Sequence, residues 1–208
     1  FIRADMSVTG VNMAVAATGS VILVENEGNI RMSTTCPPVH VAVMSMEKVA
    51  ADLDEAGDIL SMLPRTATGQ TLSSYVTLFT GPRREGETDG PEEFHLIIMD
   101  NGRHRILADP VLRDSLRCIR CGACMNSCPV YRESSGHAYR GVYPGPMGAV
   151  LGPLLADEGF GKLADLARAS TLCGACHDVC PVDIPIPDLI ARLRELSDLK
   201  AQGIVDDD

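Results

Sequence analysis

Seven of the eight cysteines in this 208-residue chain lie in two short segments, 118–128 and 173–180. The first segment has the spacing C-x₂-C-x₂-C-x₃-C-P, which is typical of bacterial ferredoxins. Two residues between successive cysteines let the chain curl around a cubane, so that three thiolates reach three irons. Pro129 then turns the chain outward, and Cys128 is expected to bind a second cluster. The spacing therefore predicts an iron–sulfur protein.

The second segment supplies the cysteines that such a pair of clusters needs. It reads C-x₂-C-x₃-C-P, with Ser170 where the first cysteine of a complete run would stand. If the last cysteine of each segment crosses to the other cluster, the first cluster has four thiolates and the second has three. The predicted ligands of cluster 1 are Cys118, Cys121, Cys124 and Cys180. The predicted ligands of cluster 2 are Cys128, Cys173 and Cys176.

The incomplete set at cluster 2 leaves three interpretations open. The cluster could be [3Fe–4S], or it could be [4Fe–4S] with its fourth iron held by Ser170, by water or by a group outside this chain. It could also be a cluster that loses iron readily. We favour a [4Fe–4S] cluster with one ligand that is missing or is not cysteine.

Other uses of the cysteines fit the pattern less well. Disulfides need an oxidising compartment, and we expect no export signal. Zinc could use paired Cys-x-x-Cys units, but it has no need for the repeated Cys-Pro endings. Cys36 stands apart and is interpreted as a lone loop or core thiol. His177, between two of the cysteines, is interpreted as a solvated loop residue, with an effect on the potential of cluster 2 as the alternative.

Composition excludes several classes of partner. The formal net charge is −10, so a nucleic-acid partner, which needs clustered Lys and Arg, is not expected. No apolar stretch approaches the roughly 20 residues that span a bilayer, so we expect no transmembrane segment and a cytoplasmic protein. The chain begins with Phe1, and we expect it to be a piece of a longer protein.

The region before the cysteines has the pattern of strands with one helix. Apolar runs between turn residues predict buried strands at 12–17, 20–25 and 39–44, and two further strands at 75–80 and 93–99. Apolar residues recur every three or four positions over 46–63, which predicts a helix that Pro64 ends. The residues at 100–102 favour a tight hairpin, in which Ile106-Leu107 would pair back on 94–98.

The composition changes after Asp109-Pro110, where we place a domain boundary. We predict an α+β chain in two parts: an α/β part at 1–108 and a mainly helical, ferredoxin-like domain with two clusters at 109–199. An amphipathic helix is expected at 188–199, and an acidic tail at 200–208.

No pattern justifies naming catalytic residues. The string G-x-G-x-x-A at 159–164 resembles a dinucleotide-binding loop, but no strand precedes it, because 154–158 has the pattern of a helix. If the α/β part were a catalyst, Glu25 and Glu27 would be its acids. We interpret both as solvated residues of a turn after a strand.

Segments along nearly the whole chain resemble the lactate utilisation protein B family of bacterial iron–sulfur proteins. The residues that carry the resemblance are Ala4-Asp5, Thr9-Gly10, Ala17 to Gly19, Val24 to Asn29, Leu63 to Arg65, Gly69-Gln70, Asp89 to His95, Asp100 to Arg103, Leu116 to Pro129 and Leu172 to Pro185. The family pattern also lacks a fourth cysteine in the second segment.

The resemblance implies a fold and a role. Residues 1–108 would be the later part of a LUD-type domain, similar to the NagB, ribose-phosphate isomerase and CoA-transferase fold. The protein would work with two companion proteins that oxidise L-lactate to pyruvate, and it would relay single electrons to a quinone-linked or other acceptor. It would be an electron-carrying subunit rather than the catalytic one. The alternatives are an iron–sulfur subunit of heterodisulfide reductase or anaerobic glycerol-3-phosphate dehydrogenase type, and a redox sensor.

Overall fold

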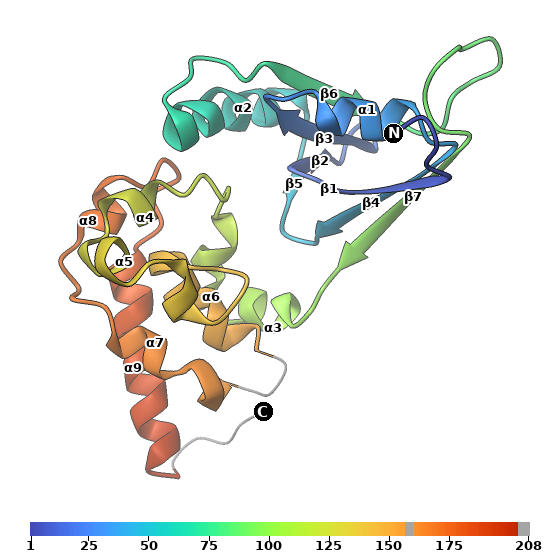
Figure 1. Cartoon of the computed structure of the whole chain (residues 1–208). Coiled ribbons are helices and arrows are strands. Elements are labelled where there is room, and N and C mark those ends of the chain that lie inside the picture. Colours follow the sequence, from blue (N-terminus) through green and yellow to red (C-terminus); the bar gives the residue numbers. More distant parts are fainter. Residues whose placement is uncertain (157–159, 204–208) are drawn as a thin grey trace. The chain divides into compact units, whose positions relative to one another are not determined.

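The chain forms two compact units, residues 1–100 and 101–208, in a computed structural model that describes residues 1–156 and 160–203 (Figure 1). The first unit contains β1 (Met6–Gly10), β2 (Met13–Val15), β3 (Ser20–Glu25), α1 (Asn29–Thr35), β4 (Val39–Ser45), β5 (Val49–Ala50), α2 (Leu53–Thr68), β6 (Tyr75–Phe79) and β7 (Glu93–Met99). The second contains α3 (Arg103–Ala108), α4 (Ala123–Ser127), α5 (Pro129–Ser134), α6 (Gly145–Leu154), α7 (Asp165–Arg168), α8 (Ala175–Asp178) and α9 (Ile186–Ala201). Short 3₁₀ turns lie at Leu112–Arg117, Gly136–Tyr139 and Phe160–Leu163.

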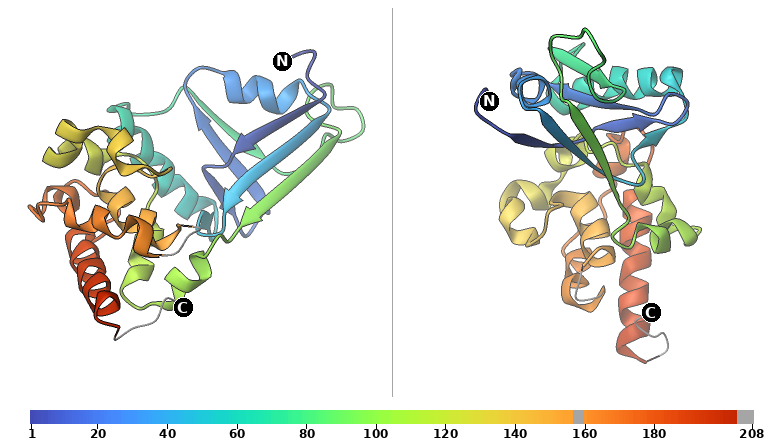
Figure 2. Two further views of the ribbon diagram at one scale, coloured as in Figure 1. Left: turned by 60° about the horizontal axis from the view of Figure 1, so that its bottom comes forward. Right: turned by 90° about the vertical axis from the view of Figure 1, so that its right-hand side faces the viewer.

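Two sheets form the first unit. One has the order β1-β4-β7, and all of its strands are parallel (Figure 2, left). The other has the order β5-β2-β3-β6, with antiparallel pairs around β3. The strands predicted at 20–25 and 93–99 are confirmed as β3 and β7, because apolar runs of this length favour buried or half-buried strands.

Apolar side chains fill the space between the two sheets and beneath α2. Val11, Val21, Ala42 and Met44 form one buried cluster, against which Phe79 and Phe94 also pack. A second cluster joins β2, β3 and β5 to the apolar face of α2. The first unit is therefore an α/β layer structure whose core is aliphatic, as the shortage of aromatic residues suggests.

The predicted helix at 46–63 was wrong at both ends. Val49 and Ala50 form β5, which pairs with β2, and α2 begins only after Asp52, whose carboxylate accepts the backbone N–H groups of Asp54 and Glu55. The helix continues through the buried Pro64 to Thr68, so this proline does not end it. It ends at Gly69, which has a φ of 76° and donates to the carbonyl of Arg65.

The hairpin predicted after β7 was also wrong. Asn101 and Gly102 have positive φ as expected, but they lead into the helix α3 and not into a returning strand. Ile106 of α3 is buried in the core of the second unit, and burial there stabilises the helix. Strand β1 and helix α1 were not predicted.

The core of the second unit surrounds the cysteine segments. Val150, Leu151, Leu189, Ile190 and Leu193 of α6 and α9 are fully buried in it, together with Cys124 and Cys176. The amphipathic helix predicted at 188–199 is confirmed as part of α9. The predictions at 157–159 and 204–208 lie outside the described residues, and within the described part of the chain no helix is long and apolar enough to cross a membrane.

Candidate iron–sulfur site

The same four-residue sequence, Cys-Gly-Ala-Cys, begins a short helix in each cysteine segment. In the first segment Gly122 precedes α4 with a φ of 80°, and in the second Gly174 precedes α8 with a φ of 88°. Glycine adopts this left-handed conformation without steric cost. Each turn leaves its first cysteine at the surface or half-buried and carries the second, Cys124 or Cys176, into the core.

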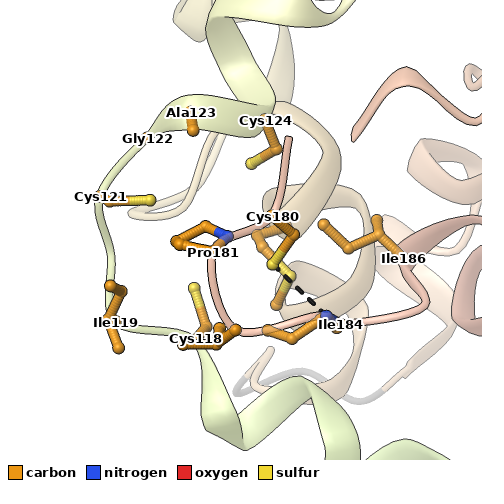
Figure 3. Close-up of a pocket in the computed structure, with 12 residues that line it drawn as sticks. Cys118, Ile119, Cys121, Gly122, Ala123, Cys124, Cys180, Pro181, Ile184 and Ile186 are labelled. Carbon is orange, nitrogen blue, oxygen red and sulfur yellow. Dashed lines mark hydrogen bonds between the residues drawn. The ribbon is translucent and has the colours of Figure 1, made fainter. Parts of the chain in front are cut away.

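Four cysteines from the two segments line one pocket. Figure 3 shows the sulfur atoms of Cys118, Cys121, Cys124 and Cys180 turned toward the same space. The other residues of the wall are mostly apolar and include Met147, Pro181, Ile184 and Ile186. The structure thus brings together the four side chains assigned to cluster 1, although Cys180 lies more than fifty residues from the other three.

Hydrogen bonds link the two segments next to each set of cysteines. The guanidinium of Arg117, the residue before Cys118, donates to the carbonyl of Asp183 over 2.8 Å. On the other side, the hydroxyl of Ser127 donates to the carbonyl of Ala175 over 3.3 Å, so α4 and α8 lie against each other. These links hold the cysteines of both segments in a fixed arrangement.

The last cysteine of each segment accepts a hydrogen bond from a backbone N–H group that follows its proline. Ile184 donates to Sγ of Cys180 over 3.4 Å, and Tyr131 donates to Sγ of Cys128 over the same distance. Such donors stabilise negative charge on sulfur, and they are one of the means by which proteins tune iron–sulfur potentials.

The three cysteines assigned to cluster 2 also lie near one another. Burial, together with smaller contributions from the negative charges of Cys128 and Cys173, raises the pKa of Cys176 to about 11. Cys173 is exposed, and its pKa is lowered by hydrogen bonds from the backbone N–H of Ala175 and from the side chain of Thr171. Cluster 2 would therefore have one edge at the surface.

The thiols of cluster 1 are more deeply buried. Burial raises the pKa of Cys124 to about 12, although the backbone N–H of Met147 opposes the shift. Burial also raises the pKa of Cys118, against the positive charge and the backbone N–H group of Arg120. Thiols with such pKa values keep their protons near neutral pH unless a metal replaces them, and iron ligation would do so.

The donor set fits iron–sulfur clusters. Among residues 1–156 and 160–203, no group of three or more His, Cys, Asp or Glu side chains is gathered closely enough to hold a single metal ion. A cubane does not require such gathering, because each thiolate binds a different iron. Four thiols around a largely apolar pocket, with backbone N–H groups directed at sulfur, are the surroundings that such a cluster needs.

The remaining polar candidates have structural roles or lie apart from the cysteines. Cys36 is exposed in the first unit. The imidazole of His177 pairs with the carboxylate of Asp183 over 2.9 Å. The hydroxyl of Ser170 accepts the backbone N–H of Leu172 over 3.2 Å. Whether Ser170 or another group completes cluster 2 stays a prediction.

The interpretation of Glu25 as a solvated turn residue was wrong. Its carboxylate is buried and accepts the backbone N–H groups of Ile30 and Arg31, each over 2.6 Å. Glu25 thus satisfies the free N–H groups at the start of α1, which carries no side-chain cap of its own. Glu27 is exposed, as expected. The G-x-G-x-x-A string at 159–164 lies partly outside the described residues.

Comparison with known proteins gives a separate family model for a part of each unit. Residues 1–99 match the LUD domain, and residues 114–184 match the 4Fe-4S dicluster domain. The protein named "Uncharacterized electron transport protein YkgF" of Escherichia coli is 55% identical over 94% of this chain and 41% of its own length. Lactate utilization protein B of Shouchella clausii is 53% identical over the same shares of the two chains. Over 94% of its length the chain is thus similar to lactate utilization protein B.

The chain spans about two fifths of the length of the curated relatives that it matches. A solved structure of a DUF162 family protein from Deinococcus radiodurans is 20% identical and has a TM-score of 0.34, over 47% of this chain and 54% of that one. At that TM-score the likeness supports no conclusion about fold or function.

Sequence reasoning missed the groups around the cysteines. Arg120 could be seen between two ligands, but its position over the ring of Tyr143 depends on the fold. The N–H group of Met147 reaches Cys124 only because α6 begins there. No signal in the sequence marks these contacts.

Proposed function

We propose that this chain holds two iron–sulfur clusters and relays single electrons in the oxidation of L-lactate to pyruvate. When bound, each cluster supplies one-electron redox chemistry at a potential that the surrounding protein sets. Lactate would be oxidised on a companion protein, and the electrons would pass on to a quinone-linked or other acceptor. The chain itself would carry electrons and would not contain the catalytic residues.

The observation that carries this proposal is the convergence of Cys180 with Cys118, Cys121 and Cys124 on one pocket. Cluster 1 would be held by these four thiolates, and cluster 2 by Cys128, Cys173 and Cys176. In the first set Cys124 is buried and the other three cysteines are half-buried, while Cys173 at the edge of the second set is exposed. An electron partner would therefore approach cluster 2 most closely on the side of Cys173.

Two other functions remain as alternatives. The first is an iron–sulfur subunit of heterodisulfide reductase or anaerobic glycerol-3-phosphate dehydrogenase type. The LUD match over residues 1–99 favours the lactate assignment, because the resemblance to those subunits rests on the cysteine runs alone. The second is a redox sensor. A relay cycles reversibly during redox titration, whereas a labile sensor loses iron on oxidation.

The test compares Cys121→Ser with Cys36→Ser, a matched change at an exposed cysteine of the first unit. Each variant is purified without oxygen, its iron and sulfide are counted, and lactate-dependent electron transfer is measured with the companion proteins present. We expect Cys121→Ser to lose cluster 1 and electron transfer, and Cys36→Ser to keep both. Electron transfer at the wild-type rate in Cys121→Ser would refute the relay.

A further inference from the structure

Arg120 has an unusual backbone conformation between two ligands of cluster 1. Its φ is 63°, in the left-handed region that residues other than glycine rarely adopt. In this conformation its backbone N–H group donates to the sulfur of Cys118, and its positive charge also acts on that thiol. Both the main chain and the side chain of Arg120 therefore favour negative charge at cluster 1.

The guanidinium of Arg120 is held in place by Tyr143. Its Cζ lies 4.4 Å from the centroid of the Tyr143 ring, which is the geometry of a cation–π contact. Arg103, which is only 3% exposed, donates to the hydroxyl of the same tyrosine over 3.1 Å. The ring also packs against the core of the second unit, so it provides a rigid support.

The position of the charge makes it effective. Nη1 of Arg120 is withdrawn from solvent, and the pocket wall next to Cys118 is apolar. Salt and water screen a charge in such surroundings much less than they screen a charge at the surface. A positive charge held near the cluster stabilises whichever redox state carries more negative charge.

We propose that Arg120 sets the reduction potential of cluster 1, and that Tyr143 holds its guanidinium where it raises that potential. This inference rests on the proposed function, since it requires that cluster 1 is bound. Reduction adds one electron to the cluster and its four thiolates and neither forms nor breaks a bond. The reduced site is one unit more negative, so the guanidinium favours it.

The test is a redox titration of the anaerobically purified protein with dithionite, followed by the electron paramagnetic resonance signals of both clusters. The signal of cluster 1 is the one that Cys121→Ser removes. In Arg120→Gln we expect reduction of cluster 1 to become about tenfold less favourable, a fall of about 59 mV, while the potential of cluster 2 stays constant. The cluster 2 signal thus serves as an internal reference.

Arg120→Lys is the matched control, because it keeps the charge and its backbone must adopt the same left-handed conformation as that of Arg120→Gln. It should retain more of the wild-type potential than Arg120→Gln does, although lysine lacks the planar group that stacks on tyrosine. Tyr143→Leu should lower the potential of cluster 1 through loss of the support, whereas Tyr143→Phe keeps the ring and should change it little. Thermal unfolding of each variant reports any loss of folding.

Three results would overturn this inference alone: an unchanged cluster 1 potential in Arg120→Gln, equal shifts for glutamine and lysine, or equal shifts of both clusters. The first would show that the charge has no effect, and the other two would indicate a general structural effect of the position. A wild-type protein that contains no iron would instead refute the proposed function, and the inference with it.

Discussion

The carboxylate of Glu25 accepts the backbone N–H group of Ile30 over 2.6 Å. Its other oxygen accepts the N–H of Arg31, so one buried side chain satisfies two donors at the start of α1. We expect Glu25→Gln to lower the free energy of unfolding of the first unit by about 1–3 kcal/mol, because an amide offers one acceptor where the carboxylate offers two. Hydrogen exchange of the α1 amides would measure the loss of protection.

Glu27→Gln is the control for this change, because Glu27 is exposed two positions away. Its effect should stay within about 0.5 kcal/mol, as is usual for surface substitutions. Neither variant should change the iron content, since both lie in the first unit. Full protection of α1 in Glu25→Gln, together with lost electron transfer, would contradict the structural role and would favour the catalytic interpretation of Glu25.

His40 gives the first unit a pH-dependent stability. It is fully buried between Phe79 and Phe94, and its Nε2 shares a hydrogen bond of 2.8 Å with the hydroxyl of Thr9. Burial lowers the pKa of His40 below its ordinary 6.5. The folded state therefore keeps a neutral imidazole at a pH where the unfolded chain already binds a proton.

This contribution of His40 is fully present above pH 6.5 and is lost as the pH falls below that value. The loss approaches about 1.4 kcal/mol per pH unit, until the pH reaches the lowered pKa of the folded state. We expect His40→Phe to flatten this part of the profile, because phenylalanine binds no proton. Urea unfolding of both proteins at pH 7.5, 6.5 and 5.5 would test it, and parallel profiles would refute the role of His40.

Local sequence patterns predicted part of the first unit. They failed for strands that form only because they pair with residues distant in the sequence. The runs at 20–25 and 93–99 are apolar enough to specify β3 and β7 by themselves. In β1, Met6 and Val8 are exposed and the neighbouring residues are small or polar, so the strand exists through its parallel pairing with β4. That pairing joins residues more than thirty positions apart, and no local pattern reveals it.

The cysteine spacing led to a prediction of the cluster ligands, which stays a prediction, and left the surrounding fold open. The rule that a Cys-Pro ending crosses to the other cluster placed Cys180 with Cys118, Cys121 and Cys124, the residues that line the pocket. The spacing could not indicate how deeply each thiol is buried. It also could not indicate the contact of Arg120 with Tyr143, because several short helices must first pack together.

The cysteines should differ strongly in reactivity when iron is removed. Cys173 is exposed, and hydrogen bonds lower its pKa, whereas burial raises that of Cys124 to about 12 and that of Cys176 to about 11. Because the thiolate is the nucleophile, iodoacetamide at pH 7.5 should modify Cys173 first and the two buried thiols last. Mass spectrometry of the iron-free protein at successive times would give this order.

Thr171→Val provides the control for Cys173, because it removes a side-chain hydrogen bond to the thiol and keeps the shape of the residue. The modification of Cys173 should become slower at pH 7.5 while the rates at Cys124 and Cys176 stay the same. If all three cysteines react at one common rate, the iron-free protein does not keep the arrangement described above.

A substitution of Gly148 in α6 would test how closely this helix packs against Tyr143. A Cβ atom at this position would lie 1.9 Å from the carbonyl oxygen of Tyr143, and a backbone oxygen cannot move away without shifting the chain. We expect Gly148→Ala to destabilise the second unit by about 1–3 kcal/mol or more. It should also weaken iron binding, because α6 directs the N–H of Met147 at Cys124.

Gly57→Ala makes the same change in the interior of α2, where a Cβ would meet nothing within 4 Å. Alanine favours a helix over glycine, so this control should stabilise the first unit by about 0.5–1 kcal/mol. The unfolding temperature should therefore fall in Gly148→Ala and rise in Gly57→Ala. The iron content should fall in Gly148→Ala and stay unchanged in Gly57→Ala. Equal unfolding temperatures would mean that α6 does not approach the carbonyl of Tyr143 as closely as described.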